Sequence, residues 1–248
     1  MRAFGRWVLW VLLAGVALQL FFLGRIAVMV AVDPHSTAFQ RSEAWRLARD
    51  SVRGEERWRW AQRWVDGDAI SPHLKRAVIA SEDAGFLSHR GVDWEAIENA
   101  WQKNERRAQQ AERRAAQNPQ RPAREPKIVG GSTITQQLAK NLLLSGERTL
   151  LRKGQELVLA VLLEALLSKP RILEIYLNSV EWGEGVFGAE AAAQRYFGKP
   201  ASRLTPAEAA RLAVMLPSPK FFETRPGSAY LARRTGTILA RMGAVELP

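Results

Sequence analysis

The sequence predicts a mostly α-helical protein with one membrane-spanning helix at its N-terminus. An uncharged, apolar run covers residues 7–24, and helix-start signals followed by apolar residues at helical spacing recur through the rest of the 248 residues. With 47% hydrophobic and 25% charged residues, the chain can form a substantial core and does not have the composition of a disordered protein. The simplest organisation is therefore one main domain behind an anchor.

The N-terminal run is long enough to cross a bilayer. After residues 7–24 the single Arg25 interrupts the run, and the apolar pattern then resumes through Val32. A bilayer core takes about 20 apolar residues in a helix. We therefore predict a transmembrane helix at 7–32. A cleavable signal peptide is the alternative, but its apolar region usually spans only about 7 to 15 residues.

The residues that flank this helix predict its orientation. Arg2 and Arg6 precede the apolar run, and basic residues favour the cytoplasmic side of a membrane. Residues 1–6 are therefore expected in the cytoplasm, and everything after about Val32 on the opposite side of the membrane.

The net charge and the absence of cysteine restrict the kinds of ligand and metal site that the chain can have. A formal net charge of +11 is compatible with nucleic-acid binding, but a domain outside the cytoplasm would meet phospholipid head groups and lipid-linked pyrophosphates instead. We therefore expect membrane contact and no nucleic acid. The absence of cysteine excludes disulfides and thiolate metal sites but does not decide the compartment.

The segment 33–70 is interpreted as juxtamembrane. Within it, residues 43–64 combine several arginines with four tryptophans, namely Trp45, Trp58, Trp60 and Trp64. This mixture is typical of a membrane–water interface. An ordinary amphipathic packing helix explains it equally well.

A pair of carboxylates follows the first helix of the main domain. Ser71 and Pro72 form a helix start, since serine caps the helix and proline fits its first turn. Glu82 then falls near the C-terminus of this helix, where the helix dipole disfavours the ionised carboxylate and raises its pKa toward a value useful for a base. A structural role for Glu82 and Asp83, paired with arginines and backbone amides, is the alternative.

A second motif opens another helix. Thr133 and Gln136 fit a capping box, and the helix is expected to run to about Leu144. The polar side chains are expected on one arc of this helix and the apolar ones on the other; the polar arc comprises Gln136, Gln137, Lys140 and Asn141. Gly130 and Gly131 allow a close backbone approach, and the free N–H groups at the helix start are suited to an anion. A solvated surface is the alternative.

Residues 102–127 separate these two motifs. The segment is rich in Arg, Gln, Ala and Glu, has few large apolar residues, and contains three prolines in its second half. It predicts a basic helical extension followed by an exposed loop. We assign it no chemistry, since a solvated charged face explains it.

A third motif places carboxylates in an apolar helix. Residues 157–167 are apolar around nearly the whole helix apart from Glu164, and Glu156 immediately precedes them. Such a helix is expected at the centre of the core. A buried carboxylate needs partners, and the neighbouring candidates are Arg148, Arg152 and Lys153. Pro170 then begins a further helix, and Thr205 and Glu208 fit a capping box at the start of a later one.

Five blocks of this sequence, in order, resemble the family 51 glycosyltransferases, which polymerise the glycan strands of bacterial peptidoglycan. The resemblance runs from about Ser71 to Lys220, and it is closest to the monofunctional biosynthetic enzymes, because no Lys-Thr-Gly or Ser-x-x-Lys pattern for acyl transfer is present. The blocks are Glu82–Gly91, Gly130–Asn141, Arg171–Asn178, Gly188–Lys199 and Leu212–Pro217.

The resemblance implies a lysozyme-like helical glycosyltransferase domain at 71–248, on the outer (periplasmic) face of the inner membrane of a bacterium. It implies lipid II and lipid-linked glycan as substrates, with Glu82 as the base and Glu156 as a second functional carboxylate. Substrate-binding residues are expected from all the motifs: Asp83, Phe86, His89, Ser132, Thr133, Gln136, Gln137, Lys140, Arg148, Arg152 and Lys153.

The chemistry that the resemblance implies is an inverting transfer. The base deprotonates the GlcNAc 4-hydroxyl of the acceptor, and undecaprenyl diphosphate leaves without needing a proton, so cations are required where a glycosidase would have an acid. Lys140, Arg148, Arg152 and Lys153 supply positive charge.

No cofactor is required by the sequence. A divalent cation, Mg²⁺ or Mn²⁺, at the diphosphate is left open, because His35, His73 and His89 are scattered and form no evident metal site. Cell-wall synthesis or division proteins are possible partners. Two alternatives stay open: a lysozyme-like peptidoglycan hydrolase, and a non-catalytic membrane-anchored glycan-binding scaffold.

Overall fold

The structure is a computed structural model that describes residues 2–55, 58–117, 130–144, 146 and 149–248. The prediction of a mostly α-helical fold is confirmed, since 69% of the chain is helical. In chain order the elements are α1 (Arg2–Val28), α2 (Ala38–Val52), β1 (Ala61–Gln62), η1 (Gly67–Ala69), α3 (Pro72–Glu82), α4 (Trp94–Gln117), α5 (Ile134–Leu143), α6 (Leu150–Leu166), α7 (Lys169–Ser179), β2 (Glu181–Gly183), β3 (Val186–Phe187), α8 (Ala189–Phe197), η2 (Ala201–Arg203), α9 (Pro206–Met215), α10 (Pro219–Glu223) and α11 (Ala229–Met242).

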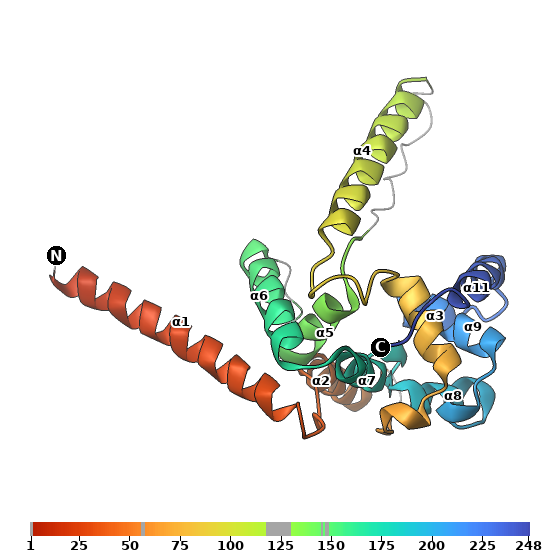
Figure 1. Cartoon of the computed structure of the whole chain (residues 1–248), viewed down its shortest axis with the longest axis horizontal. Helices are drawn as coiled ribbons and strands as arrows, with labels where there is room; N and C mark the ends of the chain where they lie inside the picture. Colours follow the sequence, from red (N-terminus) through yellow and green to blue (C-terminus); the bar gives the residue numbers. More distant parts are fainter. Residues whose placement is uncertain (1, 56–57, 118–129, 145, 147–148) are drawn as a thin grey trace.

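Helix α1 extends away from the body of the molecule (Figure 1). Its residues Ala3–Val28 are long and apolar enough to cross a membrane, and only 6% of the most apolar stretch is buried. The helix ends at Val28 and not at the predicted residue 32. The reason is tertiary: Met29 is buried against the body, and Arg171 of α7 donates a hydrogen bond to its carbonyl (2.9 Å).

Residues 33–70 pack into the body, and the predicted boundary at residue 71 does not coincide with a structural boundary. Helix α2 packs against α5. Strand β1 pairs in parallel with β3, aligning Ala61 with Val186. The buried Asn178 side chain then binds both the N–H and the carbonyl of Val65 (3.0 and 2.9 Å). Of the two explanations for the tryptophan-rich stretch, α2 therefore fits the packing helix, although Trp45 on it is exposed.

Two groups of helices form the body (Figure 1). Helices α3, α9 and α11 pack on one another, and α5 packs against α2, α6 and α7. A small sheet of order β1-β3-β2 lies beside α8 and α10. The apolar core is continuous between the groups, with Trp182, Tyr176 and Phe86 among its largest buried side chains.

The predicted helix starts are confirmed. The Ser71 hydroxyl accepts the His73 N–H at the start of α3. Reciprocal capping boxes begin α5 at Thr133 and α9 at Thr205. Each box satisfies two backbone donors that the helix cannot satisfy itself.

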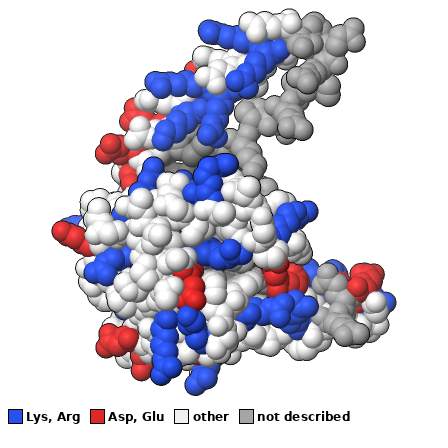
Figure 2. Space-filling view, turned by 90° about the vertical axis from the view of Figure 1, so that its right-hand side faces the viewer, with Lys and Arg blue, Asp and Glu red and all other residues white. Residues whose placement is uncertain are grey.

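Helix α4 forms an arm that projects from the body (Figure 1). Basic side chains gather on this arm (Figure 2), and those of the described residues beyond Gln102 are Lys103, Arg106, Arg107, Arg113 and Arg114. The predicted helical extension is confirmed as far as Gln117. The predicted loop falls largely on residues 118–129, which lie outside the described part of the chain.

Helix α6 is only half buried, so the prediction that it lies at the centre of the core is wrong for one face. Leu159 and Leu163 are fully buried, whereas Val158 and Val161 of the same predicted segment are 48% and 49% exposed. An apolar circumference is also typical of a helix that faces lipid on one side, and α6 is the helix of the body that contacts α1.

Candidate active site

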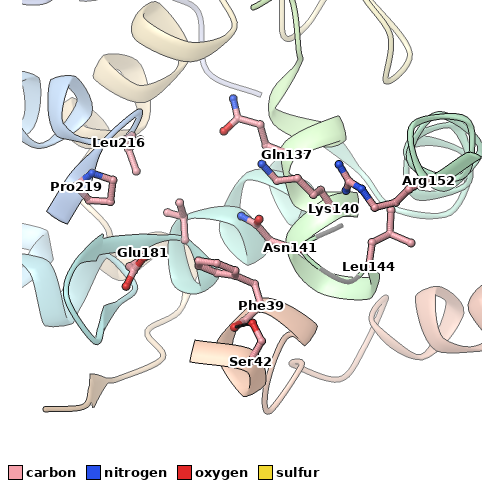
Figure 3. A pocket seen from close by; sticks show the side chains of 12 residues that line it. Phe39, Ser42, Gln137, Lys140, Asn141, Leu144, Arg152, Glu181, Leu216 and Pro219 are labelled. Atoms are coloured by element: carbon pink, nitrogen blue, oxygen red, sulfur yellow. Dashed lines mark hydrogen bonds between the residues drawn. The ribbon is translucent and has the colours of Figure 1, made fainter. Parts of the chain in front are cut away.

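A cavity of about 380 Å³ lies between the two helix groups, in the size range of ligand sites. Helix α5 contributes Gln137, Lys140 and Asn141, and α6 contributes Arg152. Phe39 and Ser42 of α2, Glu181 of β2, and Leu216 and Pro219 line the other sides (Figure 3). We call this cavity the cleft.

Glu82 is the last residue of α3. It is not among the lining residues of the cleft but borders it through a hydrogen bond with Gln137, which does line it. Its two carboxylate oxygens accept hydrogen bonds from Gln137 Nε2 (3.1 Å) and Ser81 Oγ (3.2 Å). Burial raises the pKa of the Glu82 carboxyl, and the adjacent Asp83 charge adds to this, while the two hydrogen bonds and Arg234 oppose it. The direction agrees with the sequence prediction, but the largest cause is burial.

Tyr176 of α7 fixes the orientation of Gln137. Its hydroxyl donates to Gln137 Oε1 (3.0 Å), which leaves the amide nitrogen of Gln137 to donate to Glu82. Tyr176 is buried, and burial together with the nearby Glu82 and Asp83 charges raises its pKa well above the usual range, so the hydroxyl stays a donor at neutral pH. The sequence analysis missed this residue, although it lies inside the matched block Arg171–Asn178.

Asp83 joins the first motif to the second. Its carboxylate accepts the Ile134 N–H (2.9 Å), the first N–H of α5, and it is hydrogen-bonded to His89 Nε2 (2.9 Å). The Thr133 hydroxyl donates to the Gly91 carbonyl (2.6 Å). The anion at the start of α5 is thus the protein's own Asp83, which positions the helix that carries Gln137.

Several residues predicted to bind substrate are instead part of this framework. Phe86 is fully buried, and Thr133 and Gln136 are buried and used in the capping box of α5. Gln136 therefore does not share the cleft-facing arc with Gln137. The close backbone approach at Gly131 is made by the protein itself and not by a ligand: a Cβ there would lie 2.9 Å from the Ala96 carbonyl of α4.

Glu156 lies on the opposite side of the site, buried in α6. It forms ion pairs with Lys153 (2.5 Å) and with Arg152 (3.7 Å), so two of its three predicted partners are confirmed. The third, Arg148, lies outside the described residues. Lys153 also approaches the Ser132 hydroxyl at 3.5 Å, and both residues lie beside the cleft and not among its lining residues.

Arg152 lines the cleft, and part of its guanidinium lacks hydrogen-bond partners among the described residues. The buried Nε atom has none, and the buried Nη1 atom has only the 3.7 Å ion pair with Glu156. The Arg152 side chain extends into the cavity from α6, and that of Lys140 extends from α5 (Figure 3). Buried unpaired guanidinium donors are costly, and their geometry matches phosphate oxygens. This side of the cleft is therefore suited to an anion.

Glu181 lies across the cleft from these cations and was missed by the sequence analysis (Figure 3). Burial raises its pKa to about 7, and the nearby Glu43 contributes, against the pull of Lys220 at 3.5 Å. The available sequence signal was a single acid between the apolar Val180 and Trp182, directly after a matched block.

Asp83, His89 and Asp93 lie close enough to hold a metal ion, with ligand atoms within 4.8 Å of one another. The sequence analysis had treated the histidines as scattered and missed this grouping. Each member already has a hydrogen-bond partner: His89 Nδ1 accepts the Gly91 N–H, and Asp93 accepts the Ala96 N–H. These bonds support a structural role for the group.

Comparisons with known proteins identify relatives over nearly the whole chain. Residues 51–243 match the family described as Transglycosylase. The chain is 51% identical to the biosynthetic peptidoglycan transglycosylase of Burkholderia orbicola (strain MC0-3), over 95% of this chain and 87% of that protein. It is 50% identical to the proteins of the same name from Paraburkholderia phytofirmans, over 98% of this chain and 94% of that one, and from Burkholderia pseudomallei (strain K96243), over 100% and 90%.

Proposed function

The chain belongs to the transglycosylase family, and from this premise we propose that it is a peptidoglycan glycosyltransferase that polymerises lipid II into linear glycan strands. Relatives about 50% identical over most of the chain are named for this activity. The family match of residues 51–243 contains Glu82, Glu156 and the cleft-lining residues other than Phe39 and Ser42 of α2. We assign no transpeptidase activity, because the sequence has no acyl-transfer motif.

Glu82 is the proposed general base. Its raised pKa suits proton abstraction near neutral pH, and Gln137 holds one of its oxygens at the cleft edge. The Glu82 carboxylate accepts the proton of the GlcNAc 4-hydroxyl, and that oxygen forms the new bond to the anomeric carbon of the lipid-linked glycan. Attack from the face opposite the leaving group inverts the configuration.

The cations are proposed to stabilise the leaving group. The bond between the anomeric carbon and the diphosphate oxygen breaks with its electron pair, and undecaprenyl diphosphate departs as an anion. The observation that carries this assignment is that Arg152 and Lys140 both line the cleft, and that Arg152 keeps donors without a hydrogen-bond partner among the described residues. Glu156 holds Arg152 and Lys153 in place, which is a positioning role for the second carboxylate.

A divalent cation at the diphosphate was left open by the sequence, and the described cleft residues do not favour a resident metal. Mg²⁺ prefers several carboxylate and other oxygen ligands. Among the described residues that line the cleft, Glu181 is the one acid, and it lies opposite the cations. We therefore derive no step through a metal.

The location is also a proposal. Helix α1 supports a single membrane anchor. The basic residues at the N-terminus support a cytoplasmic start, which would expose the catalytic domain on the periplasmic face of the inner membrane. Lipid II would then reach the cleft from the same leaflet. Cell-wall synthesis or division proteins are further possible partners.

A peptidoglycan hydrolase is the remaining catalytic alternative, since a carboxyl of raised pKa is also suited to a general acid. The cation side of the cleft argues for the transferase, because cleavage of a glycan strand creates no diphosphate anion. A scaffold gives no reason for the Tyr176–Gln137–Glu82 chain of hydrogen bonds.

The test is product length. Detergent-purified full chain is incubated with labelled lipid II, and separately with preformed glycan strands, and the products are resolved by length. We expect lipid II to be converted to muramidase-sensitive polymer by the wild type and by Glu105→Gln, a matched change on the exposed arm, and not by Glu82→Gln. Shortened strands would identify a hydrolase instead. No change in the length of either substrate would support the non-catalytic glycan-binding scaffold.

A further inference from the structure

A second cavity lies where α1 meets the body, outside the cleft. It measures about 660 Å³ and is lined by the last turns of α1, the segment 32–36 and Arg41 of α2. The exposed apolar side chains Leu20, Phe21 and Val28 form one wall. Figure 1 shows the end of α1 and the start of α2 joined by this short segment. We call this cavity the anchor groove.

Two arginines, Arg25 and Arg41, line the anchor groove. They are close enough for the charge of Arg41 to act on Arg25, while the Arg41 guanidinium donates to the carbonyl (3.2 Å) and the hydroxyl (3.1 Å) of Ser36. Asp33 is the acid among the groove-lining residues, but it forms an ion pair with Arg171 (2.7 Å) and is thereby neutralised. Like charges at close range repel each other, so the groove presents a net positive site that is complementary to an anion.

The depth of Arg25 indicates which anion is available. Residues 7–24 are uncharged, and as a helix they rise about 27 Å at roughly 1.5 Å per residue, close to the roughly 30 Å of a bilayer core. Arg25 therefore lies at the level of the lipid phosphates of the outer leaflet, and the apolar wall lies at the level of the acyl chains. His35 and Ser36 line the solvent side of the groove.

We propose that the anchor groove binds the phosphate of an anionic phospholipid between Arg25 and Arg41, with an acyl chain along Phe21 and Val28. The inference rests on the membrane anchoring proposed above and not on the assignment of the catalytic residues. The site is separate from the cleft, but the two share α2, since Arg41 lines the groove while Phe39 and Ser42 line the cleft.

The experiment titrates full-length protein in neutral detergent with phosphatidylglycerol or phosphatidylcholine and counts bound lipids by native mass spectrometry. We expect tighter retention of phosphatidylglycerol by the wild type. The double variant Arg25→Gln/Arg41→Gln should lose about thirtyfold in this affinity, because each basic residue near a headgroup contributes roughly a fivefold factor. Arg53→Gln, the same charge change at the far end of α2, should bind like the wild type.

Three outcomes would overturn the proposal: equal retention of both lipids by the wild type, unchanged phosphatidylglycerol binding by the double variant, or stoichiometric displacement of phosphatidylglycerol by undecaprenyl diphosphate, which would make the groove part of the substrate path. Thermal melting verifies that the double variant is folded, and Arg25→Lys/Arg41→Lys should retain most of the selectivity. Flotation of the protein with neutral vesicles tests membrane anchoring by itself. A failure of the anchoring hypothesis can therefore be distinguished from a failure of phospholipid binding in the anchor groove.

Discussion

The two sides of the cleft treat their carboxylates in opposite ways. On the base side, Glu82 is surrounded by the neutral donors Ser81 and Gln137, and burial raises its pKa. On the cation side, Glu156 forms ion pairs with Lys153 and Arg152, and Arg152, which lines the cavity, keeps donors without a hydrogen-bond partner among the described residues. Neutral donors keep a carboxylate available to accept a proton, whereas two cations commit it to ion pairing.

The comparison separates two functions that a glycosyl transfer needs. In the proposed mechanism, the base side accepts the proton of the acceptor hydroxyl, and the cation side stabilises the charge of the departing diphosphate. Helix α5 contributes to both, since Gln137 binds Glu82 while Lys140 lies with Arg152. The framework that positions α5, above all Asp83 at its first N–H, is therefore common to both functions.

The largest effect should come from removing the base. We expect Glu82→Gln to lower kcat for lipid II polymerisation by about 10²- to 10⁴-fold, because the amide cannot accept the proton. Glu105→Gln should have no effect, and thermal melting should show that both variants are folded. Full polymerase activity of Glu82→Gln would place the base elsewhere.

The second largest effect is expected from removing the charge of Arg152. We expect Arg152→Gln to reduce kcat/KM by about 10²-fold, because a preorganised donor to the developing anion is lost. Lys153→Gln should cost less, since Lys153 lies outside the lining of the cleft. Affinity for undecaprenyl diphosphate, measured by displacement of a labelled analogue, should fall in parallel. Equal losses in kcat/KM for the two variants would show that the cation side acts through its overall positive charge and not through a specific contact between Arg152 and the phosphate.

A smaller effect is expected from Tyr176→Phe, which removes only the hydroxyl that orients Gln137. With Gln137 free to turn, Glu82 loses a hydrogen bond that lowers its pKa. We expect activity to fall by about tenfold and the acid limb of the pH–rate profile to move to higher pH. Tyr230→Phe, on the half-exposed face of α11, is the control. An unchanged profile would show that Gln137 is oriented without Tyr176.

The smallest effect is expected from Glu181, which belongs to neither the base side nor the cation side of the cleft. Its pKa is about 7 in the folded protein against an ordinary value of 4.5, so the folded state binds the extra proton between these values. This contribution to stability is present below pH 4.5 and is lost as the pH rises through 7. We expect the Tm of the wild type to fall more between pH 5 and pH 8 than that of Glu181→Gln, by about 5 °C. Parallel curves would show that Glu181 ionises normally.

The local features of the fold were predictable because each depends on a few adjacent residues. The caps at Ser71, Thr133 and Thr205 and the start of α7 are signals of this kind. The error at α6 has a related cause. An apolar circumference indicates an apolar environment, and it does not distinguish a protein core from a lipid-facing side.

The candidate site was predictable only in part. The polar arc predicted from helical spacing does bring Gln137 and Lys140 into the cleft. Gln136 is buried instead, because its side chain is used in the capping box of α5. Phe39 lies far from the matched motifs in sequence, and Glu181 lies three residues beyond the matched block Arg171–Asn178. Their presence in the cleft depends on how α2 and β2 pack.

The sequence by itself determined the family, the single apolar anchor, the starts of the main helices and the position of Glu82 at a helix end, because these are encoded in periodicity, caps and short motifs. Only the tertiary structure decided that Asp83 caps α5, that Tyr176 orients Gln137 toward Glu82, and that Arg152 keeps donors without a hydrogen-bond partner among the described residues. These are relations between side chains on different helices, and they exist only once burial has brought those helices together and removed the water that would otherwise satisfy each group.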